Sequence, residues 1–298
     1  MLLSNADIHI RDPFVVVVPD ERRYVMTGTT GENAWSGQPT GFNVYVSDNL
    51  EQWEGPIPAF RPAPGFWSDR NYWAPEIHAY RGRYYMFASF KAEGVCRGTQ
   101  ILSADSPRGP FQPHSARPLT PSDWECLDGT LHVDADGNPW MVFCHEWVQV
   151  HDGEICALRL SDDLSSVAGD PITLFRASEA PWITPIEGQT DFVTDGPFLY
   201  RAQNGELLML WSSFSNGGYT LGVARSASGT VTGPWHQDAI PLYAEDGGHG
   251  MLFHTFDPQG MQSHGQLMLT LHRPNKSPDE RPIFIPIGES DGVLKVLC

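Results

Sequence analysis

The segment at positions 193–214, VTDGPFLYRAQNGELLMLWSSF, contains all parts of a β-hairpin. A polar corner with Asp195 leads into an apolar strand, an Asn-Gly turn follows, and a second apolar strand ends in small hydroxyl residues. Short apolar runs bounded by Gly, Asn and Pro predict strands rather than helices. Which fold the sequence predicts then depends on whether this hairpin occurs more than once in the chain.

Four other segments repeat the plan of corner, strand, turn and strand. They start at positions 11, 74, 127 and 248, so with the unit at Thr194 consecutive units begin about 53 to 67 residues apart, which is a typical spacing of propeller blades. They read RDPFVVVVPDERRYVMTGTT, APEIHAYRGRYYMFASF, LDGTLHVDADGNPWMVFCHEW and GHGMLFHTFDPQGMQSHGQLMLTLHRPN.

A second, outer hairpin follows each unit, as in FNVYVSDNLEQWE after the first. Five units of four antiparallel strands predict an all-β fold, a five-bladed β-propeller. No long segment has a helical period, so little helix is expected. We expect a single domain over 1–298, with blades at approximately 11–55, 72–121, 127–175, 194–243 and 248–298.

The charge of the chain restricts its partners. The net charge is −17, with only 19 Lys and Arg. Nucleic acids and anionic membrane surfaces are bound by clustered basic residues, so neither is an expected partner. A neutral ligand or a bound cation remains compatible with this charge.

Cysteine usage and the N-terminus bear on localisation. The five cysteines, an odd number without CxxC spacing, indicate reduced thiols, although one disulfide between Cys144 and Cys156 stays open. The start MLLSNADIHIRDPF lacks the pattern of a signal peptide, and no apolar run approaches membrane-spanning length. These features predict a cytoplasmic protein.

Propeller geometry brings polar residues from all five units to one face. If the first strand of each unit lines the channel, its first residues surround the mouth, and the second strand returns there. Alone, an Asp at such a corner is a common turn former. Several carboxylates around one channel repel each other unless a cation, a substrate or divergent pKa values offset the repulsion. The expected set is Asp12, Glu76, Asp128, Asp195 and His249 from first strands, and His145, Glu146, Trp147, Phe214, His272 and Arg273 from second strands.

Paired carboxylates beside aromatic rings suit cleavage of a glycosidic bond. One carboxylic acid protonates the leaving oxygen and one carboxylate activates water. Trp73 and Trp147 would offer flat surfaces to a sugar ring. We therefore expect Trp73, Glu76, His145, Trp147, Phe214, His272 and Arg273 to contact the substrate.

The corners RDPF, APEIHAY, LDGTLHV, DGPFLY and GGHGMLF together resemble glycoside hydrolase family 43 over nearly the whole chain. That resemblance implies a five-bladed propeller that hydrolyses α-L-arabinofuranosyl or β-D-xylosyl linkages with inversion. It implies that Asp12 is the general base and that Asp128 orients the acid and tunes its pKa. It also implies a calcium ion in the channel near His249, often held through water, with no organic cofactor.

The fourth unit departs from the family pattern. The family has Glu-Gly-Pro with Glu as the general acid, whereas this chain has Asp195-Gly-Pro. The shorter side chain leaves three interpretations open. Asp195 is the acid, or Glu146 supplies the proton while Asp195 orients it or binds substrate, or hydrolysis is lost and the protein only binds sugar.

The leading prediction is an inverting exo-glycosidase that releases a terminal sugar from oligosaccharides. The sugar would be α-L-arabinofuranose, β-D-xylose or β-D-galactofuranose. One alternative is a catalytically silent sugar-binding propeller. Another is a retaining hydrolase of the fructan-cleaving type, with a covalent intermediate on Asp12.

Overall fold

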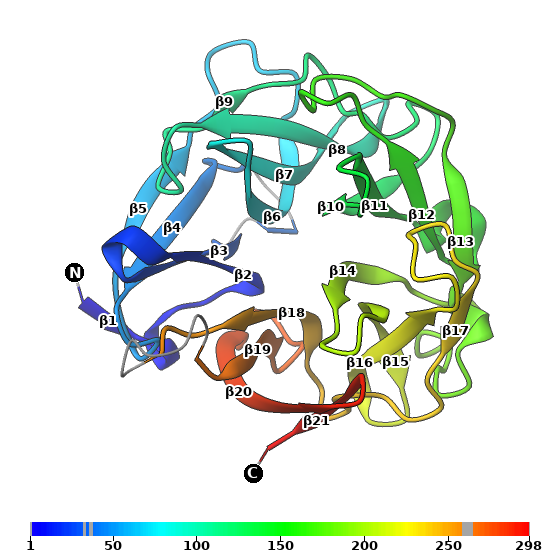
Figure 1. The fold of residues 1–298 in the computed structure, drawn as a ribbon. Coiled ribbons are helices and arrows are strands. Elements are labelled where there is room, and N and C mark those ends of the chain that lie inside the picture. Colours follow the sequence, from blue (N-terminus) through cyan, green and yellow to red (C-terminus); the bar gives the residue numbers. More distant parts are fainter. Residues whose placement is uncertain (1, 32–33, 36–37, 258–264, 298) are drawn as a thin grey trace.

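The computed structural model describes residues 2–31, 34–35, 38–257 and 265–297, and it contains five antiparallel sheets arranged in a ring around a channel (Figure 1). The predicted all-β, five-bladed β-propeller with four antiparallel strands per blade is confirmed. Helical structure in the described ranges is restricted to α1 (Trp147–Val150) and three 3₁₀ turns, η1 (Asn5–Asp7), η2 (Pro19–Glu21) and η3 (Ala177–Glu179).

In each blade the first long strand lies innermost and later strands follow outward. The first blade contains β2 (Arg11–Val18), β3 (Arg23–Thr29), β4 (Phe42–Ser47) and β5 (Gln52–Phe60), and β1 (Leu2–Ser4) is a fifth strand on its outer edge. The second contains β6 (Arg70–Tyr80), β7 (Arg83–Ala92), β8 (Val95–Ala104) and β9 (Gln112–Pro113).

The remaining three blades have the same order. The third contains β10 (Cys126–Val133), β11 (Pro139–His145), β12 (Glu154–Arg159) and β13 (Ile172–Arg176). The fourth contains β14 (Asp195–Arg201), β15 (Leu207–Ser215), β16 (Gly218–Ser226) and β17 (Trp235–Gln237). The fifth contains β18 (Gly248–His254), β19 (Leu267–Arg273), β20 (Arg281–Ser290) and β21 (Val293–Val296), and β2 packs beside β18 and β19 to close the ring.

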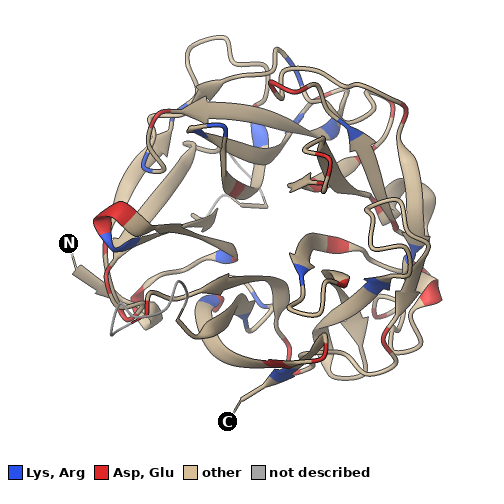
Figure 2. Ribbon diagram, in the orientation of Figure 1, with Lys and Arg blue, Asp and Glu red and all other residues tan. Residues whose placement is uncertain are grey.

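The hydrophobic core is divided among the junctions between neighbouring blades. Phe143 packs between the second and third blades, Trp211 between the third and fourth, and Leu269 between the fourth and fifth. Val25 and Phe253 belong to the largest cluster, which joins the fifth, first and second blades. Because both faces of each sheet are covered, the strands read as nearly continuous apolar runs. Positions with charged residues are spread around the ring (Figure 2).

The cysteines in the described ranges, Cys96, Cys126, Cys144 and Cys156, are free thiols. Cys144 lies opposite Ile155 in the pairing of β11 with β12, so a Cys144–Cys156 disulfide is not formed. Cys298 lies outside the described residues.

A β-bulge interrupts the innermost strand of every blade close to the channel mouth. The same place in each bulge has a left-handed backbone, with φ between 43° and 57°. Such a conformation costs a residue with a Cβ roughly 1–2 kcal/mol, and only glycine avoids that cost. The five residues are Asp12, Ala74, Asp128, Gly196 and His249.

Hydrogen bonds between blades hold these bulges. In four of them the backbone N–H of the left-handed residue donates to the side chain near the end of the preceding blade's second strand. The N–H of Gly196 instead donates to Oδ2 of Asp128 (3.0 Å). The other pairs are Asp12 with His272 Nδ1 (3.2 Å), Ala74 with Thr29 Oγ1 (2.8 Å), Asp128 with Ser89 Oγ (3.0 Å) and His249 with Ser212 Oγ (2.8 Å).

This ring of hydrogen bonds predicts a difference between two adjacent serines. We expect Ser212→Ala to lower the free energy of unfolding by about 1–3 kcal/mol, because the N–H of His249 loses its buried acceptor. Ser213 is the matched control, since its hydroxyl is buried and has no partner within the described part of the chain. Urea denaturation followed by tryptophan fluorescence measures both variants. Equal losses from Ser212→Ala and Ser213→Ala would contradict a stabilising role for the inter-blade bond.

Candidate active site

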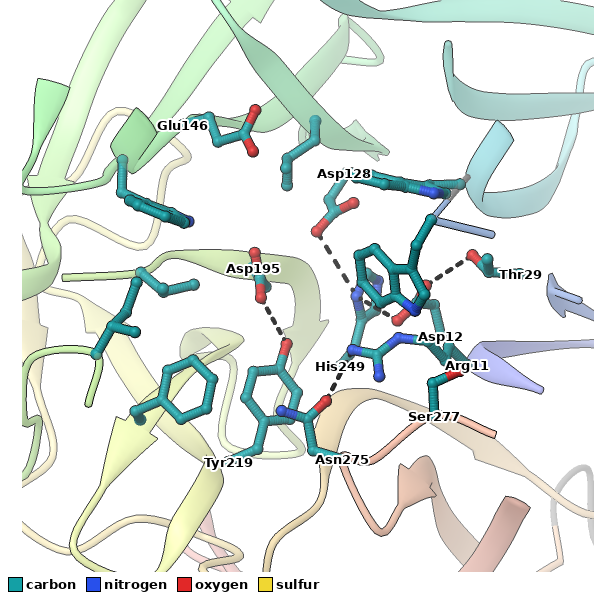
Figure 3. Close-up of a pocket in the computed structure, with 17 residues that line it drawn as sticks. Arg11, Asp12, Thr29, Asp128, Glu146, Asp195, Tyr219, His249, Asn275 and Ser277 are labelled. Carbon is teal, nitrogen blue, oxygen red and sulfur yellow. Dashed lines mark hydrogen bonds and ion pairs between the residues drawn. The ribbon is translucent and has the colours of Figure 1, made fainter. Parts of the chain in front are cut away.

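A cavity of about 530 Å³ lies at the channel mouth, beside the bulges (Figure 3). Because four bulges project side chains into it, residues far apart in the sequence meet there. Eight residues expected from the sequence line the cavity: Asp12, Trp73, Asp128, Glu146, Trp147, Asp195, Phe214 and His249. Arg11, Thr29, Trp35, Leu127, Ile186, Val193, Tyr219, Asn275 and Ser277 complete the lining.

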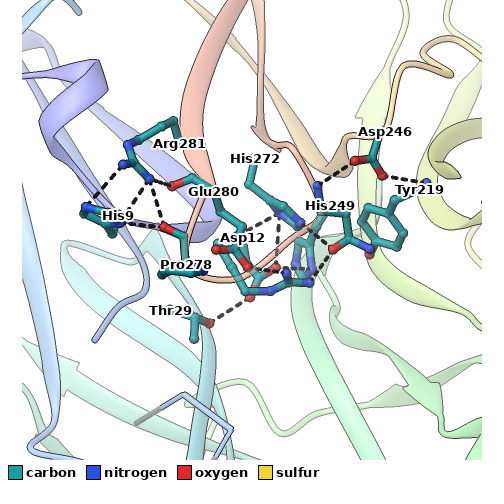
Figure 4. Close-up of polar contacts among 12 residues, drawn as sticks. His9, Asp12, Thr29, Tyr219, Asp246, His249, His272, Pro278, Glu280 and Arg281 are labelled. Atoms are coloured by element: carbon teal, nitrogen blue, oxygen red, sulfur yellow. Dashed lines mark hydrogen bonds and ion pairs between the residues drawn. The ribbon is translucent and has the colours of Figure 1, made fainter. Parts of the chain in front are cut away.

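Asp12 is a buried carboxylate with two strong partners. Its Oδ2 accepts a hydrogen bond from the hydroxyl of Thr29 (2.7 Å), and its Oδ1 lies 3.1 Å from Nδ1 of His249 (Figure 4). Burial alone would raise the pKa of Asp12, but the charge and hydrogen bond of His249, together with other neighbours such as Arg11, outweigh burial and hold that pKa well below its usual range. Asp12 is therefore ionised across the neutral pH range.

His249 supplies positive charge at the centre of the carboxylates. Its Nδ1 also lies 3.6 Å from Oδ2 of Asp128. Burial disfavours the imidazolium, yet Asp12 and Asp128 together raise the pKa of His249 to about 10. A protonated His249 thus offsets part of the negative charge that the bulges bring together.

Asp195 projects from the start of β14 into the cavity. Its Oδ2 accepts a hydrogen bond from the hydroxyl of Tyr219 (2.9 Å). Burial raises the pKa of Asp195 and of Asp128, and repulsion between the nearby carboxylates adds to the rise, although His249 opposes it. The site therefore contains one strongly acidic carboxyl group, Asp12, and two that hold a proton more readily.

Glu146 lies at the edge of the cavity and is neutralised by a cation. It forms an ion pair with Arg97, and both side chains are buried. Burial raises the pKa of Glu146, while Arg97 opposes the rise. The Arg97 guanidinium also stacks on Trp73, 4.1 Å from the ring centroid. Glu146, Arg97 and Trp73 therefore form one packed wall.

Four residues expected to contact the substrate do not line the cavity. Arg273 pairs with Glu245 (3.1 Å) on the exposed end of β19. His272 is fully buried behind Asp12, and burial lowers its pKa to about 3. A neutral His272 can accept the N–H of Asp12 and donate through Nε2 to Asn275 (3.2 Å).

The other two residues are buried in the walls. Nε2 of His78 lies 3.0 Å from a carboxylate oxygen of Glu76. Glu76 lies two residues beyond Ala74, the left-handed residue of its blade, so it is not equivalent to Asp12. His145 stacks on Trp124 with ring centroids 4.2 Å apart, and its ring nitrogens engage Glu154 and Gln149.

Several lining residues were not expected from the sequence. Tyr219 lies on a third strand, and only first and second strands were expected to reach the mouth. Arg11 donates a hydrogen bond to Asn275 (2.7 Å), which lies just after β19 where the second strand was expected to reach the mouth. Arg11 also lies over Trp35, 5.0 Å from the ring centroid. The RDPF motif places Arg11 directly before Asp12, and this was the feature of the sequence that could have indicated Arg11 as a lining residue.

The calcium ion expected near His249 has no evident set of protein ligands. Nδ1 of His249 faces Asp12 and Asp128. Within the described ranges, no three His, Cys, Asp or Glu side chains are grouped as metal ligands. An ion held largely through water needs no such group, so the calcium ion near His249 stays a prediction and no catalytic step is assigned to it.

Comparisons with known proteins agree with this geometry. A family model for glycosyl hydrolases family 43 matches residues 7–281. The chain is 43% identical to a solved endo-arabinase from Bacteroides thetaiotaomicron VPI-5482, with a TM-score of 0.87 and coverage of 97% of this chain and 98% of that one. It is 25% identical over 267 residues to the extracellular endo-α-(1→5)-L-arabinanase 1 of Bacillus subtilis (strain 168), covering 82% of this chain and 72% of that one.

A second curated relative is the extracellular exo-α-(1→5)-L-arabinofuranosidase ArbA of Cellvibrio japonicus (strain Ueda107), 25% identical over 145 residues, or 43% of this chain and 40% of that one. Because both curated relatives are extracellular, the expectation of a cytoplasmic protein is wrong. In the described ranges, no helix is long and apolar enough to cross a membrane. The family match and the carboxylate pocket lead to one conclusion: the chain belongs to glycosyl hydrolases family 43 and is a glycoside hydrolase that acts on oligosaccharides.

Proposed function

We propose that the protein hydrolyses internal linkages of α-1,5-linked L-arabinan with inversion of configuration. The main observation that supports this proposal is the 43% identity to an endo-arabinase along almost the whole of both chains. The Bacillus subtilis relative, named an endo-arabinanase, supports the same substrate.

Endo action replaces the exo action expected from the sequence. A second cavity of about 800 Å³ adjoins the first, and Arg11, Thr29 and Ser277 line both. A concave surface that continues past the carboxylates suits a chain of sugars better than a single terminal sugar. The names of the relatives support the same choice.

The proposed roles follow from the charge states. Asp12, kept ionised by His249, removes a proton from the attacking water. Asp195, whose pKa is raised and whose carboxyl is aimed by Tyr219, protonates the leaving oxygen. Repulsion from Asp195 is one cause of the raised pKa of Asp128, so these two neighbouring carboxyl groups hold a proton more readily than Asp12 does. Glu146 is paired with Arg97, so we assign it to substrate binding, together with Trp73, Trp147 and Phe214.

The size of the first products tests the mode of action. On linear α-1,5-arabinan, we expect mixed oligosaccharides and a steep loss of viscosity before arabinose accumulates. Size-exclusion chromatography and viscometry follow the two quantities. Arabinose or one short product released from the start would favour the second candidate, an exo enzyme like the Cellvibrio japonicus relative. Saturable binding without any product would favour a silent sugar-binding propeller.

A further inference from the structure

The ring of inter-blade hydrogen bonds is broken at one blade, beside the proposed acid. In four blades an acceptor side chain on the second strand takes the N–H of the next blade's left-handed residue. Pairing registers place Cys144 at the corresponding position of the third blade, since Cys144 lies opposite Leu127 as Thr29 lies opposite Arg11. A thiol is a weak acceptor, and the N–H of Gly196 donates to Asp128 instead.

The first blade shows what a hydroxyl does at this position. Thr29 accepts the N–H of Ala74 (2.8 Å) and donates its own proton to Asp12 (2.7 Å). Oδ2 of Asp12 is therefore held within its own blade, and Thr29 rather than Asp12 contacts the next bulge. Asp128 occupies the equivalent bulge of the third blade, but with Cys144 behind it the carboxylate itself reaches the next blade.

The bond from Gly196 to Asp128 acts directly on Asp195. The Gly196 N–H belongs to the Asp195–Gly196 peptide, so fixing that peptide fixes the backbone from which the Asp195 side chain projects. The backbone is closely packed here and admits only glycine, because Gly196 has a φ of 52° and a Cβ added to it would lie 2.6 Å from the His249 ring. Cys144 is itself fully buried.

We propose that Cys144 is a positioning residue. Because Cys144 lacks a hydroxyl, the Asp128 carboxylate accepts the Gly196 N–H, holds the Asp195–Gly196 peptide and lies beside the proposed acid. This inference rests on the proposed function only for its effect on catalysis. A serine at 144 would complete the ring as Ser89 and Ser212 do, accept the Gly196 N–H and draw Asp128 back into its own blade.

The test compares Cys144→Ser with Cys144→Ala, which provides no acceptor. The Gly196 amide is observed by NMR in protein labelled with ¹³C-carbonyl Asp and ¹⁵N-Gly, which restricts the signals to Asp-Gly pairs. We expect Asp128→Asn to move the Gly196 amide proton in the wild-type and Cys144→Ala backgrounds. In the Cys144→Ser background we expect no such response, since serine has taken the bond. Thermal unfolding checks that each variant is folded.

Activity gives the second readout. We expect kcat of Cys144→Ser on an arabinan oligosaccharide to be roughly 10-fold below that of Cys144→Ala, with KM nearly equal, since misplacement by about 1 Å near reacting groups costs up to ~100-fold. A Gly196 amide that responds to Asp128→Asn in all three backgrounds would overturn the proposal. So would equal kcat values for the serine and alanine variants. A wild-type protein that cleaves no arabinan would refute the proposed function while leaving the amide result interpretable.

Discussion

Asp12→Asn is expected to lower kcat on arabinan oligosaccharides by about 10⁴-fold, the upper range for loss of a general base. The amide cannot take the proton from water, although its oxygen can still accept the Thr29 hydroxyl. His249 would also lose a partner at 3.1 Å, so its pKa should fall from about 10. Initial rates on linear arabino-oligosaccharides, with products separated by chromatography, provide the measurement.

Two comparisons make this result specific to the base. Asp20→Asn removes an exposed carboxylate in the η2 turn and should leave kcat unchanged. Azide, a nucleophile that needs no deprotonation, should restore part of the turnover of Asp12→Asn and form a glycosyl azide of inverted configuration. Retention of more than about a tenth of the wild-type kcat by Asp12→Asn would be incompatible with the assignment, given the size of general-base effects.

The propeller was predictable because its signal is redundant. Each blade repeats a corner, an apolar strand and a polar turn, and five repeats outweigh any ambiguity in one of them. The bulges were not predictable in the same way. A bulge shifts the register by one residue, and nothing in APEIHAY marks Ala74 rather than Glu76 as the equivalent of Asp12. Glu76 was therefore expected at the mouth but is buried in the wall.

Side-chain partners from outside the local hairpin could also not be predicted from the sequence. The sequence left both Asp195 and Glu146 open as the acid, because both are carboxylates at strand ends near one mouth. The structure distinguishes them by their neighbours: Tyr219 donates to Asp195, whereas Arg97 pairs with Glu146. Neither neighbour follows from local pattern, since each comes from a strand outside the hairpin that holds the carboxylate.

The dependence on the leaving group separates the two candidate acids. We expect Asp195→Asn to lower kcat/KM on arabino-oligosaccharides by about 10²–10⁴-fold, because the departing sugar oxygen then leaves without a proton. On 2,4-dinitrophenyl α-L-arabinofuranoside the loss should nearly vanish, since this leaving group needs no protonation. Glu146→Gln is the matched comparison, because it also replaces one carboxylate of the same cavity by an amide.

Glu146→Gln should lower kcat/KM by a similar factor on both substrates, mainly by raising KM. The reason is that the substitution leaves Arg97 buried without its anion and disturbs the wall under Trp73. The pH profile adds an independent check. If Asp195 is the acid, kcat/KM of the wild type falls as pH rises through its raised pKa, and this limb disappears in Asp195→Asn but persists in Glu146→Gln. The reverse pattern, with the aryl substrate relieving only Glu146→Gln, would assign the proton to Glu146 and leave Asp195 to orient it.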